Sequence, residues 1–569
     1  MTDKRIYWFW AAIALNYLNL LFMHYTCLTA GIIEDETDIT AIADNLLGVA
    51  FDVTFIFLLF YFFSSKRLKC AAVCTFCVTI IWAYCNVLYC RFFHHYISFS
   101  AITQTYNLLD IQMLKAVLTG VRWSDIFIIF YAFVAYTIIK HIKPVKNTIR
   151  KVLLSLFAIA IIDGCSYIYL CSQKPEYRYV SFFIQRFEHR QISSHLHLCS
   201  PNHETFRRGS IRVLLKDLID NKRTYQLTEQ QCQTILKYSQ KAKPSIKVGN
   251  IHDTKEKNVI FIIVESYMSF TSDLRVNGRE ATPFMNALKH DSTVYYNGNM
   301  QDNTTIGESS DGQFIYMTGI LPMRSVITIT KARDTTLPGL PKMLLGKESR
   351  MIIPTAASMW NQDVMCRQYG FNQLFSVSDY QGDHDTNLND KQVFQLAMEK
   401  DKTSKQPFIS VILTMSMHQP YTEQIDPTFR ITDDSMSNEL ACYLNACHYT
   451  DQQIAKYIQH LKDIGLYNNS LIIIAADHSV HNTDFGGVSK QIPLYIVNPG
   501  ISRQKMWQGE CNQLDIYTTL LDLMGCDSEW YGLGQSLAST NYSHSIHRQA
   551  WDVSDWIIMG DYFSKYKYE

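Results

Sequence analysis

The sequence lacks an excess of either charge. Its 569 residues include 52 lysines and arginines and 52 aspartates and glutamates, so the formal net charge is zero. Nucleic acid binding depends on a basic surface, and this balance gives the chain as a whole no such surface. We therefore expect no nucleic acid partner. The length exceeds what one hydrophobic core usually supports, which predicts two or more domains.

Paired cysteine motifs are also missing outside the apolar first third of the chain. Of the fifteen cysteines, the seven after residue 171 are scattered, without a CxxC pair, so neither a zinc cluster nor a disulfide framework is indicated. A single bridge, such as Cys511 with Cys526, stays open. The cysteines within or at the ends of apolar segments are expected to act as small hydrophobic side chains. They are Cys27, Cys70, Cys74, Cys77, Cys85, Cys90, Cys165 and Cys171.

Long apolar runs fill the first third. A membrane-spanning helix needs about 20 mostly apolar residues. Five stretches qualify, at residues 6–33, 46–63, 70–90, 126–142 and 152–171. No small-residue cleavage site precedes the later runs, so the first is not interpreted as a cleaved signal peptide. We predict a five-helix transmembrane domain over residues 1–171.

The basic residues predict how this domain is oriented. Lys4, Arg5, the loop 66–69 and the stretch 140–151 fall on one side, and the acidic loop 34–38 falls on the other. Lysine and arginine collect on the cytoplasmic side of membrane proteins. We therefore expect the amino terminus in the cytoplasm and everything after residue 171 outside. Residues 172–256 are predicted to be a juxtamembrane helical connector.

The remaining residues, 257–569, have the sequence pattern of an α/β domain, which we expect to be extracytoplasmic. Short apolar runs typical of buried parallel strands occur at 258–264, 350–353, 408–414 and 470–476. Helical stretches lie between or beside them, at 282–289, 390–400 and 437–464. Strands that alternate with helices predict a parallel sheet covered by helices.

Three of these strands end in residues that bind metals. The strand 470–476 runs directly into Asp477 and His478, the strand 258–264 into Glu265, and His418 follows the strand 408–414. Burying such groups is costly unless something compensates, and ligands collect at the carboxyl ends of parallel strands. One such residue would be incidental, but three at the same edge predict a divalent metal site.

A candidate nucleophile lies in residues 304–314. Ser310 and Gln313 have the spacing of a helix capping box, so we expect Ser310 to be an N-cap. That leaves Ser309 at a helix amino terminus, where backbone N–H groups favour phosphate and an alkoxide. A serine hydroxyl needs a base or a metal to become a good nucleophile. A metal held by the carboxylate and imidazole groups at the sheet edge would activate it.

With these motifs in this order, the chain resembles the lipoteichoic acid synthase-type phosphoglycerol transferases, a membrane branch of the alkaline phosphatase/sulfatase superfamily. The family's motifs match residues 264–266, 307–314, 360–363, His418 and 477–478. The resemblance implies metal ligands Glu265, Ser309, Asp477 and His478, with Ser309 and His418 catalytic. It implies substrate contacts from Trp360, Asn361, Gln362, Asp363, His418 and His481.

The resemblance also implies the reaction. A phosphoglycerol group would pass from a phospholipid such as phosphatidylglycerol, through a covalent phospho-Ser309, to a hydroxyl of an envelope glycan, lipid or polymer. The cofactor would be one divalent metal, Mn²⁺ first, with Mg²⁺ or Zn²⁺ as alternatives. The enzyme would lie in the bacterial cell membrane. Two positions depart from the family: Ser309 replaces a threonine of equivalent chemistry, and the neutral Gln362 replaces a substrate-contacting arginine.

Three alternatives stay open. A phosphoethanolamine transferase that modifies lipid A or an envelope glycan would share the five-span plan, although such enzymes usually have a disulfide-rich soluble domain. A sulfatase would need the sequence Cys-x-Pro/Ala-x-Arg, and residues 199–203 lack the arginine. A catalytically inactive membrane receptor would be expected to have lost a ligand or the nucleophile, and neither is missing here.

Overall fold

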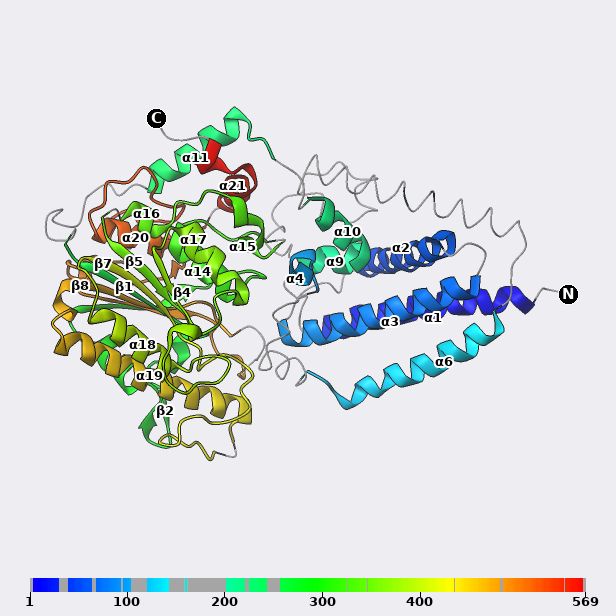
Figure 1. Ribbon diagram of the computed structural model, residues 1–569, viewed down its shortest axis with the longest axis horizontal. Coiled ribbons are helices and arrows are strands. Elements are labelled where there is room, and N and C mark those ends of the chain that lie inside the picture. Colours follow the sequence, from blue (N-terminus) through cyan, green and yellow to red (C-terminus); the bar gives the residue numbers. More distant parts are fainter. Residues whose placement is uncertain are drawn as a thin grey trace. The chain divides into compact units, whose positions relative to one another are not determined.

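The computed structural model describes residues 4–29, 39–63, 68–93, 96–103, 120–142, 158, 161, 201–220, 225–242 and 256–565, apart from positions 325, 345, 434, 481–484 and 547. These residues form two compact units, divided between residues 223 and 224 (Figure 1). The first unit is helical. The second contains the sheet.

The first unit is built from long apolar helices and three short ones. Its elements are α1 (Lys4–Thr29), α2 (Ile39–Phe63), α3 (Leu68–Phe93), α4 (Phe99–Thr103), α6 (Phe127–His141), α9 (Pro201–Arg208) and α10 (Ser210–Asp220). Helices α1, α2 and α3 pack against one another, and α6 packs against α1 and α3. Most large side chains of α6 are exposed, as expected of a helix that faces lipid.

Three helices in the described part of the chain are long and apolar enough to cross a membrane, at Ile42–Tyr61, Lys69–Arg91 and Trp123–His141. They confirm the second, third and fourth predicted stretches. The first stretch forms α1, which is less apolar. The fifth, 152–171, lies almost wholly outside the described residues, so the count of five stays a prediction.

The helix pair α9–α10 docks on α2 at a close backbone contact. A Cβ atom on Gly48 would lie 2.6 Å from the backbone of Arg208, and Gly209, between the two short helices, has φ of +89°. Asp52 accepts hydrogen bonds from the backbone N–H groups of Ile211 (2.9 Å) and Arg212 (3.1 Å). The carboxylate thus caps the positive end of α10.

The second unit is organised around an eight-stranded sheet. Its order is β10-β4-β9-β8-β1-β7-β5-β6, and a separate two-stranded hairpin, β2-β3, lies outside it. The strands are β1 (Asn258–Val264), β2 (Arg275–Val276), β3 (Arg279–Glu280), β4 (Val294–Gln301), β5 (Glu348–Ile352), β6 (Gln373–Phe375), β7 (Phe408–Leu413), β8 (Ser470–Ala476), β9 (Ile492–Val497) and β10 (Cys511–Asn512). All strands of the large sheet are parallel except β9, which is antiparallel to β4 and β8.

Helices cover both faces of this sheet (Figure 1). Helices α18 and α19 lie on one face, and α14, α17 and α20 lie on the other. The helices of this unit are α11 (Glu229–Ala242), α13 (Pro283–His290), α14 (Ser309–Thr318), α15 (Thr328–Lys331), α16 (Leu340–Met343), α17 (Gln362–Tyr369), α18 (Asp390–Asp401), α19 (Asn438–Asp463), α20 (Asp515–Leu523), α21 (Arg548–Gly560) and α22 (Tyr562–Lys565). One core joins both sides of the sheet.

The predicted strands and helices of the α/β domain are confirmed as β1, β5, β7 and β8 and as α13, α18 and α19. The predicted connector 172–256 contributes to both units: α9 and α10 belong to the first, and α11 packs against α21 in the second. The limits of the three predicted domains stay a prediction.

Candidate metal and nucleophile site

Strand register brings the first two predicted ligands together. Strands β1 and β8 are parallel neighbours, and Val264 pairs with Ala476 at their carboxyl ends. The next residues in the chain are Glu265 and Asp477, which therefore leave the sheet side by side. Both β1 and β8 are buried along their whole length, so neither carboxylate has ready access to water.

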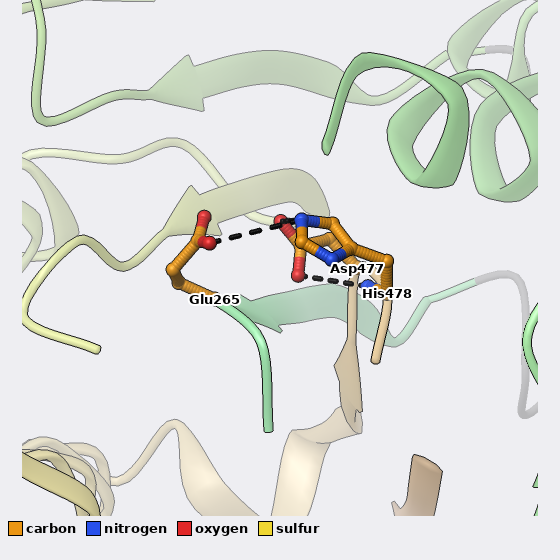
Figure 2. Close-up of side chains that lie close together, drawn as sticks. All are labelled: Glu265, Asp477 and His478. Atoms are coloured by element: carbon orange, nitrogen blue, oxygen red, sulfur yellow. Dashed lines mark hydrogen bonds and ion pairs between the residues drawn. The ribbon is translucent and has the colours of Figure 1, made fainter. Parts of the chain in front are cut away.

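Glu265, Asp477 and His478 form a buried cluster whose ligand atoms all lie within 4.8 Å of one another. Figure 2 shows the three side chains turned toward a common point. Nε2 of His478 is 3.7 Å from Oε1 of Glu265 and 3.6 Å from Oδ2 of Asp477. Two carboxylates and an imidazole are ligands suited to a divalent cation.

Ser309 completes this cluster. Its Oγ donates a hydrogen bond to Oε2 of Glu265 (3.3 Å) and lies 3.1 Å from Nε2 of His478. Nδ1 of His478 is 2.7 Å from the carbonyl oxygen of Ser479, which can only accept. A proton is thereby assigned to Nδ1, so the neutral form of the ring presents the lone pair of Nε2 to the cluster. The donor set of oxygen, oxygen, nitrogen and hydroxyl fits one divalent metal.

Ser266, which sequence reasoning did not single out, holds both carboxylates in place. Its backbone N–H donates to Oδ1 of Asp477 (2.8 Å), and its Oγ donates to Oε1 of Glu265 (2.8 Å). Ser266 adopts φ of +50°, an uncommon conformation for a residue with a side chain. Tyr443 stabilises this turn by donating to the carbonyl oxygen of Ser266 (3.0 Å).

Burial and neighbouring charges shift the pKa values of Glu265, Asp477 and His478. Burial, with the neighbouring charge of Glu265, raises the pKa of Asp477 to about 7. Burial alone would lower the pKa of His478, but Asp477 and Glu265 outweigh it and raise that pKa to about 10. For Glu265, burial opposes ionisation, yet His418 and His478 lower its pKa below the ordinary value. The cluster therefore favours the binding of a positive charge, either a proton or a metal cation.

These pKa values predict that metal binding releases protons. A metal binds ionised Asp477 and neutral His478, whereas the metal-free protein holds protons on them below about pH 7 and about pH 10 respectively. Affinity should therefore rise with pH, by about tenfold per unit for each proton displaced. Calorimetry of Mn²⁺ binding in buffers of different ionisation enthalpy, at pH 6 to 8, should detect between one and two protons released. Binding without proton release would contradict the assignment.

Ser309 is held at the amino terminus of α14 by a folded loop. The predicted N-cap at Ser310 is wrong: the helix begins at Ser309, the preceding Glu308 has φ of +43°, and Oγ of Ser310 donates to the carbonyl oxygen of Gly307 (2.7 Å). The Ser310 hydroxyl therefore bonds to the preceding loop and does not cap the helix.

Asp311, inside the same helix, braces the loop. Its Oδ2 accepts from Thr305 N (3.1 Å), Thr305 Oγ1 (2.7 Å) and Gly307 N (3.0 Å). Burial raises the pKa of Asp311 to about 6. A Cβ atom on Gly307 would lie 2.3 Å from the carboxylate, so glycine is needed for this contact.

Gly312 sets the distance between Ser309 and the cluster of Glu265, Asp477 and His478. A Cβ atom at this position would lie only 2.2 Å from the backbone oxygen of Asp477. The first turn of α14 therefore rests directly on the end of β8, one turn after Ser309. This contact explains how Ser309, the first residue of α14, comes within hydrogen-bond distance of a strand-end cluster.

We expect Gly312→Ala to lower catalytic activity by about 10²-fold, because moving reacting groups by about 1 Å has that effect. The measurements are kcat/KM and the thermal midpoint of the full-length protein. Gly509→Ala is the control, because its Cβ atom would meet only the ring of the exposed Trp507. Equal activity in the two variants would show that the α14–β8 contact does not position Ser309.

His418 is placed by a buried carboxylate. Oδ1 of Asp390 accepts from the backbone N–H groups of Met415 (2.7 Å) and Ser416 (2.8 Å), which fixes the turn before His418. Nδ1 of His418 is 2.6 Å from the carbonyl oxygen of Gln419. That bond assigns the proton to Nδ1 and leaves Nε2 for a substrate.

Residues 360–363 lie where a short 3₁₀ helix, Met359–Asn361, meets α17. Trp360 and Asn361 both have left-handed backbone conformations, with φ of +53° and +58°, and Gln362 begins α17. Helix α17 packs against α14. Gln362 is 5% exposed and Asp363 is exposed. Their contacts with a substrate stay a prediction, and so does that of His481, which lies outside the described residues.

Comparison with known proteins gives matches to both units. The family described as "Sulfatase" matches residues 257–526, and "Lipoteichoic acid synthase N-terminal domain" matches residues 1–177. Lipoteichoic acid synthase 2 of Bacillus subtilis is 25% identical over 477 residues, covering 79% of this chain and 71% of the relative. Lipoteichoic acid synthase 1 of the same organism is 27% identical, with coverages of 81% and 74%.

Among solved structures, the lipoteichoic acid synthase LtaP from Listeria monocytogenes is similar to part of the chain. It is 20% identical, with a TM-score of 0.44, and the match covers 55% of this chain and 81% of that one.

Proposed function

Since the chain belongs to the lipoteichoic acid synthase-type family of the alkaline phosphatase superfamily, we propose that it transfers phosphoglycerol from phosphatidylglycerol to a hydroxyl of the cell envelope. The acceptor is a glycan, a lipid or a growing polymer. The observation that carries the proposal is the position of Ser309, whose Oγ lies 3.1 Å from His478 and 3.3 Å from Glu265 at the start of a helix.

The first step forms a covalent enzyme. Oγ of Ser309 loses its proton to solvent and attacks the phosphorus atom of the phosphodiester, and the bond from phosphorus to the diacylglycerol oxygen breaks. His418, whose Nε2 faces away from its bond to Gln419, supplies a proton to the departing oxygen. The phosphoglycerol group is then attached to Ser309, and the helix amino terminus stabilises its charge.

The second step returns the enzyme to its starting state. An acceptor hydroxyl attacks the same phosphorus atom, its proton passes to His418, and the Ser309–phosphorus bond breaks, which leaves Oγ again without its proton. Glu265, Asp477, His478 and Ser309 would hold the metal, for which we propose Mn²⁺ with Mg²⁺ or Zn²⁺ as alternatives. When bound, it would lower the pKa of the serine hydroxyl and neutralise phosphate charge.

Location follows the same proposal. We propose that the amino terminus lies in the cytoplasm of a bacterial cell and the catalytic domain outside the membrane, because Lys4, Arg5 and the loop 66–69 are basic and such residues collect on the cytoplasmic side. A membrane anchor keeps that domain beside a lipid donor, which a soluble phosphatase would not need.

The test is donor hydrolysis by the purified full-length protein. Labelled phosphatidylglycerol and phosphatidylethanolamine are supplied separately in vesicles with Mn²⁺, and diacylglycerol release is followed. We expect release from phosphatidylglycerol. Release from phosphatidylethanolamine alone would favour the phosphoethanolamine alternative, for which the neutral Gln362 is the motivating observation. Release from neither lipid would overturn the proposed function.

A further inference from the structure

Two cysteines meet at one end of the helical unit. Sγ of Cys27, in the last turn of α1, lies 2.9 Å from Sγ of Cys90, in the last turn of α3. Their residues are 0% and 1% exposed. The bond length of a disulfide is about 2.05 Å, so the sulfur atoms need to move by less than about 1 Å to form one. This contact joins two separate helices, 63 residues apart.

This end of the unit carries the docked connector. The backbone N–H of Tyr96, shortly after α3, donates to Oδ1 of Asn202 in α9 (3.1 Å), and Nε1 of Trp82 donates to Oγ of Ser210 in α10 (2.9 Å). Tyr96 and Phe206 share one packed cluster with both cysteines. The thiols therefore lie on the side of the membrane from which the chain continues toward the catalytic domain.

Charged and aromatic residues place the same end at the membrane surface. Arg91, next to Cys90, forms a two-bond ion pair with Asp125 (2.8 Å each). The neighbouring Trp123 is 93% exposed, at the start of the apolar segment Trp123–His141. Tryptophans gather at membrane interfaces. The first turn of α1, with Lys4 and Arg5, lies at the other end of that helix.

We propose that Cys27 and Cys90 form a disulfide that ties α1 to α3 beneath the docking surface of α9–α10. The inference rests on the proposed orientation, which places this end in an oxidising compartment. The two thiols become one S–S bond, and two protons and two electrons pass to the disulfide of an extracytoplasmic thiol–disulfide oxidoreductase, which becomes a dithiol. The reaction takes place before the helices close over the thiols.

Differential alkylation of the full-length protein in its native membranes tests the bond. Thiols are trapped with acid and alkylated in detergent with light N-ethylmaleimide, then reduced and alkylated with a heavy form. Mass spectrometry should find the heavy label on Cys27 and Cys90 and the light label on Cys70, at the other end of α3. In Cys27→Ser, Cys90 should carry the light label. The light label on both residues of the unaltered protein would overturn the disulfide.

A second measurement separates the bond from the orientation. In Trp123→Cys, the new thiol should react with a membrane-impermeant maleimide added to intact spheroplasts. Reaction only after lysis would overturn the orientation, whatever the state of Cys27 and Cys90. Reaction from outside, together with light label on both cysteines, would overturn the disulfide alone.

Discussion

Replacing Ser309 by alanine is expected to lower diacylglycerol release by at least about 10³-fold, since the variant has no oxygen atom to attack phosphorus. Oγ of Ser309 is the hydroxyl held by Glu265 and His478, with distances of 3.3 and 3.1 Å. The assay is release from labelled phosphatidylglycerol with saturating Mn²⁺. Mass spectrometry of acid-quenched wild-type protein should in addition find phosphoglycerol on the peptide that contains Ser309.

Two further variants, Ser310→Ala and Ser309→Thr, test whether the loss is specific to the Ser309 hydroxyl. Ser310→Ala removes a hydroxyl one residue away that donates to the carbonyl oxygen of Gly307, so activity should change by less than about tenfold. Ser309→Thr keeps the hydroxyl and should retain measurable transfer. Full activity in Ser309→Ala, or equal losses in Ser309→Ala and Ser310→Ala, would remove Ser309 from the reaction.

The residues at strand ends could be predicted because local patterns determine them. The runs before Glu265 and Asp477 are almost wholly apolar, and such runs form buried parallel strands. The predicted sulfatase-like α/β domain is confirmed by the family match over residues 257–526. The pairing of Val264 with Ala476 follows from sheet order, which no single run encodes. The local patterns therefore predicted which groups reach one edge but not that β1 and β8 are neighbours.

The errors and omissions arise where long-range contacts decide the structure. Ser310 fits a capping box, but the packing of Gly312 on Asp477 and the bonds of Asp311 set the start of α14 two residues earlier. Strand β4 was missed because polar residues interrupt it and its pairing with β9 contains a bulge. The role of Ser266 depends on two partners, Glu265 and Asp477, which are far apart in the chain.

Asp477→Asn is expected to lower metal affinity by at least about 10²-fold, because a neutral amide replaces an anionic ligand at the centre of the cluster. Metal content after gel filtration in Mn²⁺ should fall from one ion per chain to nearly none. Addition of Mn²⁺ should raise the thermal midpoint of the wild-type protein, since an ion that binds only the folded state stabilises it, and should not raise that of the variant.

Without metal, the order of stability of the two proteins should be equal or reversed. The pKa of Asp477 is raised from 3.8 to about 7 on folding, so metal-free wild-type protein loses stability as pH rises through that interval. The amide introduced by Asp477→Asn has no such titration, and this variant without metal should be as stable as the wild type, or more stable, at pH 8.

Asp451→Asn is the matched control. Burial also raises the pKa of Asp451 to about 7, but its carboxylate accepts from Phe284 N and Met285 N outside the cluster. That variant should bind Mn²⁺ normally. Loss of metal from both variants would mean that the site is lost through general destabilisation and not through a missing ligand.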